Sequence, residues 1–449
     1  MIPSEQIDTS PYTFEYRSRS SSRLRVVLGA TVGTMLEYYD FAVYAYVATF
    51  ISRNFFQGQS SAEALLSTFL TFGIGYVARP LGGLIVGYLA DRKGRKLALL
   101  VTLFSMAIAT ALIGVLPTYR SIGLMAPVLL VVARCAQGFS AGGEAGSSMS
   151  FIVEWSPEGK RGLWGSFQQV GMMTGLLLGS AVVALLNTTL SVESMNAWGW
   201  RVPFLLGGLI GPFGMLMRRS LAETPAFEAQ RSRAALASAS SQASRVPVSR
   251  RTREWPTFVN MIVFPIGSVA AFYLLFVFMP VWMQRFEKVS PSDSLWANSI
   301  GLLTIVVTTP LMGAWSDRIG RKPVLLGSMI ALLVVPYSLL YLLDHLQAIR
   351  FGSLVAMQIV LGAIVGAACG PFPAVMAEQF RTSRRSTWLN MVIALTTSAA
   401  GGFAPFIAVW LIARTGSPLA HMFFLIAAVL VSLPTLLFIK ESAFSPLED

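Results

Sequence analysis

Residues 87–96 read Gly-Tyr-Leu-Ala-Asp-Arg-Lys-Gly-Arg-Lys, and residues 313–322 read Gly-Ala-Trp-Ser-Asp-Arg-Ile-Gly-Arg-Lys. Both copies follow the pattern G-x-x-x-D-R-x-G-R-K and stand between long apolar runs. They start half of the 449-residue chain apart. This repeat predicts a chain built from two equivalent halves, the construction by which secondary transporters expose one central site to alternate sides of a membrane.

The composition indicates a membrane protein. Hydrophobic residues make up 54% of the sequence and charged residues only 12%, whereas soluble domains carry roughly 25% charged residues. Apolar runs of about 20 residues, long enough to cross a bilayer as helices, recur along the chain. We predict an all-α protein with twelve transmembrane helices at about 25–49, 64–89, 97–116, 122–150, 163–188, 200–217, 257–283, 296–315, 323–344, 352–377, 387–412 and 419–439.

The spans divide the chain into two six-helix bundles related by pseudo-two-fold symmetry. The predicted parts are a cytoplasmic tail 1–22, a bundle 23–219, a cytoplasmic linker 220–256, a bundle 257–440 and a tail 441–449. Residues 1–22 are polar and the first apolar run is too long for a signal-peptide core, so no cleavable signal is expected.

The net charge of +12 is a signal of topology. Lys and Arg concentrate in the tail, in the linker and in loops on one side of the predicted membrane. This bias predicts that both termini are cytoplasmic in a multi-pass protein of the cell inner (plasma) membrane. It also accounts for the basic charge without a nucleic-acid partner.

The repeated signature has a predicted role as a cytoplasmic gate. Its first glycine allows close approach of backbones, and its Asp and Arg can join helix ends by charge-assisted hydrogen bonds. Such bonds would hold the halves together on one side and break when that side opens. The alternative is that the basic residues only anchor helix ends. The gate residues are Gly87, Asp91, Arg92, Gly94, Arg95, Gly313, Asp317, Arg318, Gly320 and Arg321.

The paired signature resembles that of the major facilitator superfamily, and further segments resemble its metabolite:H⁺ symporter branch. These are LEYYDF at 36–41, ARPLGG at 78–83, QGFSAGGE at 137–144, WGWRVPF at 198–204 and RRSLAETP at 218–225. The resemblance covers essentially the whole chain. It implies the twelve-helix fold and proton-driven transport of carboxylates, such as citrate and 2-oxoglutarate, or of zwitterions, such as proline and betaine.

Charged residues inside the predicted spans indicate the working site, because each costs about 2.5–3.5 kcal/mol or more at mid-membrane. Glu37 and Asp40 share one face of the first span. Arg79 and Arg134 lie too deep for their side chains to reach water from a helix end. We therefore expect the arginines to pair with the acids or to face a water-filled cavity. A purely structural salt bridge is the alternative.

The resemblance implies that Asp40 and Arg134 match a first-helix acid and a fourth-helix arginine that couple protons in related symporters. An aspartate beside an arginine stays charged, and a carboxylate solute that binds the arginine leaves the aspartate to take up a proton. Solute and proton then favour each other's binding. The predicted coupling residues are Asp40, Glu37 and Arg134, with the proton as coupling ion.

Other polar residues of the spans form the predicted solute site. A guanidinium can grip a carboxylate with two donors, and the fourth span carries a polar stripe beside a row of glycines suited to helix packing. One of Gln168 and Gln169 is expected to face the cavity, and Arg201 could equally be an interfacial anchor. The set is Arg79, Arg134, Gln137, Glu144, Gln168, Gln169, Tyr44, Asn390 and Arg201.

We therefore expect a monomeric proton symporter that imports a small organic acid, foremost a di- or tricarboxylate such as citrate. Tyr38, Tyr39, Phe41 and Tyr44 could instead cage the quaternary ammonium of an osmolyte such as betaine. The short stretch after Lys440 favours the metabolite over the osmolyte interpretation. The residues also leave open shikimate or an aromatic acid as the solute, and a transporter-like solute sensor as the function.

The sequence gives no sign of an enzyme, a cofactor or a metal site. Cys135 and Cys369 lie inside predicted spans of different halves and are expected to be core residues without a disulfide. The two histidines, His345 and His421, are far apart, and neither metal-ligand spacing nor a nucleophile motif accompanies them. The expected partners are the organic acid, the proton and the lipid bilayer.

Overall fold

A computed structural model of the chain describes residues 20–93, 95–219, 254–346, 350–380 and 385–445, with only the backbone at 20–26, 28, 87–93, 95–99, 210, 212–219 and 254. Helices and the turns between them make up this described part, which confirms the all-helical prediction. The predicted linker falls almost entirely outside it, and so does most of the N-terminal tail.

The N-terminal half contains one helical segment or a broken pair for each predicted span. Its elements are α1 (Ser20–Tyr46), α2 (Ala48–Phe55), α3 (Ser61–Val77), α4 (Arg79–Lys93), α5 (Arg95–Val115), α6 (Tyr119–Ile122), α7 (Met125–Ala141), α8 (Ala145–Trp155), α9 (Arg161–Thr189), α10 (Val192–Ala197), η1 (Gly199–Arg201) and α11 (Val202–Arg219).

The C-terminal half repeats this plan, with two spans interrupted by π-helical segments, η2 and η3. Its elements are α13 (Glu254–Val263), α14 (Ile266–Phe272), η2 (Tyr273–Phe278), α15 (Met279–Arg285), α16 (Pro291–Ile319), α17 (Arg321–His345), α18 (Phe351–Cys369), α19 (Phe372–Glu378), α20 (Arg385–Thr396), η3 (Thr397–Gly402), α21 (Ala404–Thr415), α22 (His421–Ser432) and η4 (Leu433–Leu437).

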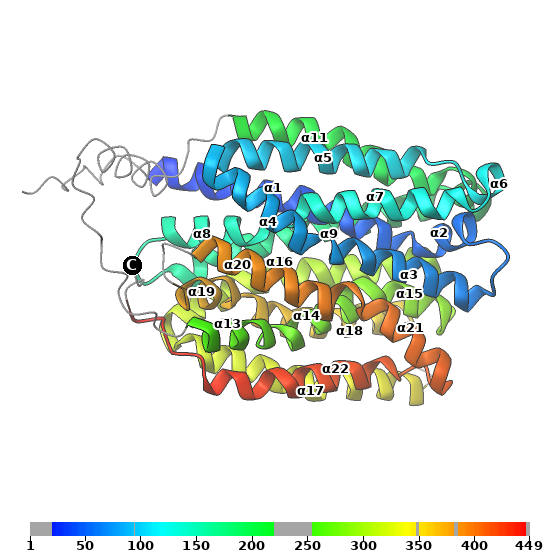
Figure 1. Ribbon diagram of the computed structural model, residues 1–449. Helices are drawn as coiled ribbons and strands as arrows, with labels where there is room; N and C mark the ends of the chain where they lie inside the picture. Colours follow the sequence, from blue (N-terminus) through cyan, green and yellow to red (C-terminus); the bar gives the residue numbers. More distant parts are fainter. Residues whose placement is uncertain (1–19, 94, 220–253, 347–349, 381–384, 446–449) are drawn as a thin grey trace, which may run out of the picture.

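The long helices run side by side, and the two halves lie against each other along their length (Figure 1). Within the described residues, eight helices are long and apolar enough to cross a membrane. Large apolar side chains are exposed on their outer surfaces, including Leu81, Val132, Leu209, Val334 and Phe423. Such surfaces suit contact with lipid rather than with water.

The start of α1, the end of α11 and the start of α13 lie at one end of the molecule (Figure 1). The second copy of the signature, at the end of α16, lies at that same end, which we call the signature end. The opposite end, where α2, α6 and α15 lie, is called the far end. Which end faces the cytoplasm stays a prediction from the charge bias.

Close approach of helices positions the charged residues of the N-terminal half. A Cβ added at Gly75 of α3 would lie 3.0 Å from the carbonyl oxygen of Arg134 in α7, and one at Gly142 would collide with the carbonyl of Arg79. Glycine at these positions lets α7 contact α3 and α4 directly. The predicted glycine row of the fourth span is thus a packing surface, and it brings the two arginines close together.

Candidate functional site

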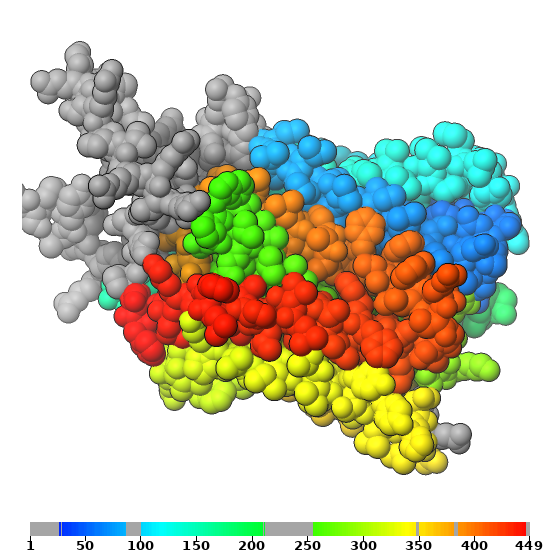
Figure 2. Space-filling view, turned by 60° about the horizontal axis from the view of Figure 1, so that its bottom comes forward, coloured from blue at the N-terminus to red at the C-terminus, as the bar shows by residue number. Residues whose placement is uncertain are grey.

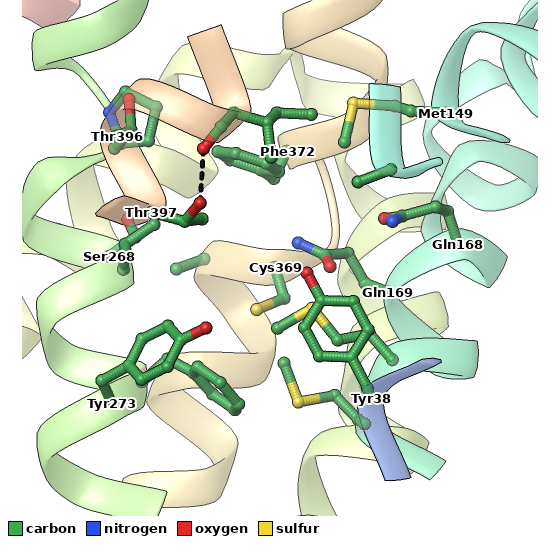
Figure 3. A pocket seen from close by; sticks show the side chains of 18 residues that line it. Tyr38, Met149, Gln168, Gln169, Ser268, Tyr273, Cys369, Phe372, Thr396 and Thr397 are labelled. Atoms are coloured by element: carbon green, nitrogen blue, oxygen red, sulfur yellow. Dashed lines mark hydrogen bonds between the residues drawn. The ribbon is translucent and has the colours of Figure 1, made fainter. Parts of the chain in front are cut away.

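A small cavity of about 60 Å³ lies between the two halves. Its walls come from α1, α8 and α9 on one side and from α14, η2, α18, α19, α20 and η3 on the other (Figure 3). The lining residues are Tyr38, Ala145, Met149, Gln168, Gln169, Met172, Met173, Pro265, Ser268, Val269, Phe272, Tyr273, Ala368, Cys369, Phe372, Ile393, Thr396 and Thr397. We call this space the central cavity.

Both glutamines of the fifth span line the central cavity, although only one was expected to do so (Figure 3). The amide oxygen of Gln168 and the hydroxyl of Ser268 are buried without a hydrogen-bond partner among the described residues. A buried polar atom of this kind costs free energy unless a guest molecule or water satisfies it. The cavity therefore offers one acceptor and one hydroxyl, from opposite halves, to a polar guest.

The other predicted solute-binding residues do not line the central cavity. Several of them bond to neighbouring helices instead, because the helical face that carries them packs inside the protein. These residues are Arg79, Arg134, Gln137, Glu144, Tyr44, Asn390 and Arg201. The central cavity itself is mostly aromatic, aliphatic and thioether in character.

Arg201 immediately precedes α11 and anchors the start of that helix to the end of α5. Its guanidinium donates hydrogen bonds to the carbonyls of Gly114 (2.9 Å) and Leu116 (2.7 Å), and it lies 4.5 Å from the Trp200 ring centroid. Of the two interpretations of Arg201, the structure favours the structural one.

Asn390 joins the two halves. Its side-chain oxygen accepts from the backbone N–H of Gly146 (2.8 Å), and its amide donates to Ser147 (3.0 Å). These contacts connect α20 with the start of α8. Glu144, which immediately precedes α8, is buried. Asn390 thus contributes to closure between the halves rather than to the cavity wall.

Arg79 and Glu37 form a buried ion pair beside the central cavity. Their charged atoms are 3.6 Å apart, and both side chains are almost fully enclosed. The guanidinium carbon of Arg79 also lies 4.3 Å from the ring centroids of Phe41 and Tyr76, where cation–π attraction supports it. Phe41 therefore belongs to the charge cluster and not to an ammonium cage.

Arg134 occupies the next position in this cluster. Its guanidinium carbon lies 4.3 Å from the Tyr44 ring and 4.9 Å from the Phe41 ring. Its Nη1 donates to the side-chain oxygen of Gln137 (2.7 Å), while Nε and Nη2 have no hydrogen-bond partner among the described residues. The cluster thus holds a buried guanidinium with spare donors.

Asp40 and Arg134 do not form the direct ion pair that was predicted. The Thr110 hydroxyl of α5 donates to Asp40 (2.8 Å) and accepts from the amide of Gln137 (2.7 Å), so two side chains separate the acid from the arginine. Thr110 was not predicted from the sequence, because a lone threonine in an apolar span usually bonds to its own helix.

The proposed aromatic cage is only partly realised. Tyr39 donates to the carbonyl of Pro203 (3.0 Å) and Tyr44 to that of Thr68 (3.1 Å), so both point into the N-terminal half. Of the four residues considered, Tyr38 alone lines the central cavity. Phe272, Tyr273 and Phe372 of the other half accompany it there (Figure 3).

At the signature end, Asp317 ties the second signature to the other half of the protein. Its carboxylate accepts from the backbone N–H groups of Gly162 (2.8 Å) and Leu163 (2.9 Å) at the start of α9. Arg321 also donates to Asp317 (2.7 Å). The N-terminus of a helix favours a negative charge, so the signature aspartate holds α9 against α16.

Glu378 extends this network across the same interface. Its carboxylate pairs with Arg161 of the N-terminal half (3.1 Å) and with Arg321 of its own half (3.2 Å). In a second bridge between the halves, Glu154 of the N-terminal half pairs with Arg385 of the C-terminal half (3.1 Å). Apart from Arg321, these residues were not predicted from the sequence. They nevertheless occupy equivalent places: an acid ends the fourth span of each half, and an arginine begins the fifth.

The other gate residues of the repeated signature lie outside the described part of this network. Arg318 is exposed, and Gly320 turns the chain between α16 and α17 with a φ of 100° that favours glycine. The first copy, with Gly87, Asp91, Arg92, Gly94 and Arg95, lies outside the residues whose side chains the structure describes, so its predicted role stays untested.

Residues after the last span close over the second signature. Glu441 accepts hydrogen bonds from the backbone N–H groups of Arg321 (2.9 Å) and Lys322 (3.0 Å). Partial burial raises the pKa of Glu441, but these backbone hydrogen bonds outweigh burial and leave its pKa below the ordinary value. The contact is therefore present at neutral pH and is lost as the pH falls through that lowered pKa.

The halves also meet between the central cavity and the far end. The hydroxyls of Tyr273 and Tyr76 are 2.7 Å apart, and Ser398 donates to the Tyr76 carbonyl (2.7 Å). Tyr46 donates to the carbonyl of Phe276 in the π-helical segment η2 (3.1 Å). Figure 2 shows α21 (orange) beside α3 (blue) on this side. The halves therefore contact each other on both sides of the central cavity.

Gly313→Val is expected to prevent closure of the signature end. A Cβ at Gly313 would lie 2.6 Å from the Gly162 carbonyl oxygen in the other half, closer than real Cβ contacts. We expect initial transport rates in membrane vesicles to fall by at least about tenfold, the effect of little more than 1.4 kcal/mol on a required state. Gly327→Val is the control, because a Cβ there meets nothing within 4 Å. Equal rates for both variants would contradict the prediction.

Comparisons with known proteins agree with this architecture. Residues 26–449 match the family described as sugar (and other) transporter. The glycine betaine/proline/ectoine/pipecolic acid transporter OusA of Dickeya dadantii (strain 3937) is 32% identical over 431 residues, 95% of this chain and 85% of that one. The citrate-proton symporter of Klebsiella pneumoniae is 32% identical over 395 residues, 88% of this chain and 87% of that one.

A solved structure shows the same fold. The proton:xylose symporter XylE, a major facilitator superfamily protein bound to 6-bromo-6-deoxy-D-glucose, has a TM-score of 0.77 at 20% identity. The match covers 95% of this chain and 98% of that one. The proline/betaine transporter of Escherichia coli (strain K12) is a further relative in sequence, 30% identical over 94% of this chain and 85% of its own length.

Proposed function

Because this chain belongs to the sugar (and other) transporter family of the major facilitator superfamily, we propose that it is a proton-coupled symporter of a small organic solute. The observation that carries the proposal is the buried charge cluster beside a cavity between the two halves. Two acids, Glu37 and Asp40, balance two arginines, Arg79 and Arg134, at a depth where unbalanced charge is costly.

Protonation of one acid would upset this balance. With Asp40 neutral, the cluster carries an excess positive charge, which favours an anionic group on the solute. Solute binding, in turn, favours the protonated acid, since coupling between two binding events is reciprocal. Glu37 is the second candidate for the proton, but it is held 3.6 Å from Arg79.

We propose a compact zwitterion of the proline or betaine type as the solute. Among the described residues, the central cavity is lined by aromatic, thioether and amide side chains and by no arginine. Tyr38, Phe272, Tyr273 and Phe372 can hold a substituted ammonium by cation–π attraction. Gln168 and Ser268 can satisfy a polar group, and the charge cluster lies behind Tyr38. OusA and the proline/betaine relatives support this choice.

A di- or tricarboxylate is the second candidate. The spare Nε and Nη2 donors of Arg134 favour it, because a guanidinium binds a carboxylate with two parallel hydrogen bonds. The citrate-proton relative also supports it. A carboxylate could reach Arg134 only after the aromatic rings around that residue move.

The two sets of contacts between the halves support alternating access. We propose that the network of Asp317, Arg321, Glu378 and Arg161 closes the signature end, and that Tyr76 and Tyr273 close the path from the central cavity toward the far end. The charge bias supports a cytoplasmic signature end in an inner-membrane protein. The present cavity is too small for any of these solutes, because ligand pockets usually measure about 300–1,000 Å³. One end must therefore loosen for loading.

Uptake into proteoliposomes with an imposed pH gradient tests the proposal. The screen includes proline, betaine, citrate, 2-oxoglutarate and shikimate. We expect accumulation of proline or betaine that collapses when a protonophore is added. Accumulation of citrate alone would replace the zwitterion by the second candidate. Binding without accumulation of any of the five would contradict transport and favour a solute sensor.

A further inference from the structure

A single file of side chains connects Asp40 to Arg134 through the interior of the N-terminal half. Arg134 Nη1 donates to Gln137 Oε1, Gln137 Nε2 donates to Thr110 Oγ1, and Thr110 donates to Asp40 Oδ2, over 2.7, 2.7 and 2.8 Å. The members come from α7, α5 and α1. Thr110, Gln137 and Arg134 are fully buried and Asp40 is 5% exposed.

The order of donors along this file is fixed by its two ends. A guanidinium can only donate, so it faces the amide oxygen of Gln137 and turns the amide nitrogen toward Thr110. Thr110 must then accept from Gln137 and has its own proton to donate. An ionised carboxylate can only accept, so that proton points at Asp40. Each hydrogen bond therefore depends on the charge state at the ends.

The surroundings of Asp40 leave it dependent on Thr110. A Cβ added at Gly207 of α11 would collide with Asp40 Oδ1, so α11 closes that side of the carboxylate. Thr110 is the one side-chain donor to Asp40 found within the described residues. Among the residues whose side chains the structure describes, the charged or titratable groups that act on Asp40 are Arg134 of α7 and Tyr39 of its own helix, and those of α5 and α11 add none.

We propose that Thr110 and Gln137 are positioning residues that transmit the protonation of Asp40 to Arg134. This inference rests on the proposed proton symport. A proton added to the Asp40 carboxylate turns a charge-assisted hydrogen bond from Thr110 into a neutral one of roughly half the strength. This weakening, passed along the file, loosens the hold of Gln137 on Arg134.

The Arg134 end of the file connects the protonation of Asp40 to solute binding. The Nε and Nη2 atoms of Arg134 lack partners among the described residues, and aromatic rings surround the guanidinium. With the hold of Gln137 loosened, Arg134 can turn its donors to an incoming carboxylate more readily. Thr110 and Gln137 thereby convert proton binding into a rearrangement of the arginine beside the solute path.

The test compares Thr110→Val and Gln137→Met with two controls. Val has nearly the shape of Thr, and Met has nearly the shape of Gln. Each substitution removes the polar group that forms the hydrogen bonds of the file. Thr110→Ser keeps the hydroxyl. Ser105→Ala removes a different α5–α7 hydrogen bond, the 2.7 Å contact of Ser105 with Ser140. The parent and all variants are assayed with the solute that the parent accumulates in the screen of five.

Two measurements are made on each variant. The first is solute counterflow at equal pH on both sides, which needs no net proton movement. The second is the pH profile of gradient-driven accumulation. For Thr110→Val and Gln137→Met we expect counterflow to persist while accumulation falls at least about tenfold and its pH profile flattens, the size expected for losing one hydrogen bond to a charged group. Thr110→Ser and Ser105→Ala should behave like the parent.

A parental pH profile in Thr110→Val or Gln137→Met would overturn the inference, and so would an equal loss in Ser105→Ala, which would indicate general damage to helix packing. If Thr110→Val does not fold, Gln137→Met decides the question by the same two measurements. A parent that accumulates none of the five solutes overturns the proposed symport itself, and this inference with it. A parent that accumulates solute alongside an unaffected Thr110→Val overturns the inference alone.

Discussion

Asp40→Asn is expected to abolish proton-driven accumulation while solute exchange continues. Asparagine has the shape of protonated aspartate and can still accept from Thr110, but it cannot release or take up a proton. A pH gradient of one unit drives about tenfold accumulation when one proton accompanies one neutral solute. In Asp40→Asn that ratio should fall to about one. Accumulation and counterflow in proteoliposomes are the two measurements.

The control for this prediction is Asp293→Asn. Asp293 lies exposed in the first turn of α16, so the same chemical change occurs outside the charge cluster. It should accumulate solute like the parent. If Asp40→Asn accumulated solute with a parental ratio, Asp40 would not be the coupling residue, and Glu37 would become the leading candidate.

Glu378→Gln is expected to open the signature end. The side chain of Glu378 is 1% exposed and faces two guanidiniums, Arg161 and Arg321, from different halves. Breaking a buried ion pair by removing one partner costs about 3–5 kcal/mol. The closed state bears most of this cost, because water can solvate the arginines once the halves separate. The closed-to-open ratio should therefore fall by about a hundredfold or more.

Labelling of Cys369 measures this change. Cys369 lines the central cavity and is 8% exposed in this structure. In a Cys135→Ser background, a membrane-impermeant thiol reagent applied at the signature end should label Cys369 in Glu378→Gln at least about ten times faster than in the parent. Glu287→Gln, at the far end, is the control. Equal labelling rates in all three proteins would show that Glu378 does not hold this end closed.

The spans could be predicted from the sequence because lipid imposes a simple rule. A helix must cover the hydrocarbon with about 20 apolar residues, and the chain contains such runs throughout. The same rule makes charges inside a span conspicuous, so Glu37, Asp40, Arg79 and Arg134 could be identified as buried. The predicted gate residues Asp317 and Arg321 do lie between the halves, as the repeated signature suggested.

The partners of those charges could not be predicted in this way. Helical periodicity places Arg134 and Gln137 on one face, but it does not say which neighbour that face meets. Glycines at 75 and 142 bring α7 against α3 and α4, and this packing turns the polar face toward α5 and α1 instead of the central cavity. Thr110 could enter the file only through that tertiary contact.

The sequence by itself determined the membrane-spanning class, the two-half plan, the family and the presence of buried acids and arginines. Those properties depend on composition and on spacing along one helix. Only the tertiary structure decided which residues line the central cavity, that Thr110 and Gln137 separate Asp40 from Arg134, and that Glu378 bridges Arg161 and Arg321. The reason is that these arrangements depend on contacts between different helices, and the mutual rotation of the helices is set by packing that no single segment encodes.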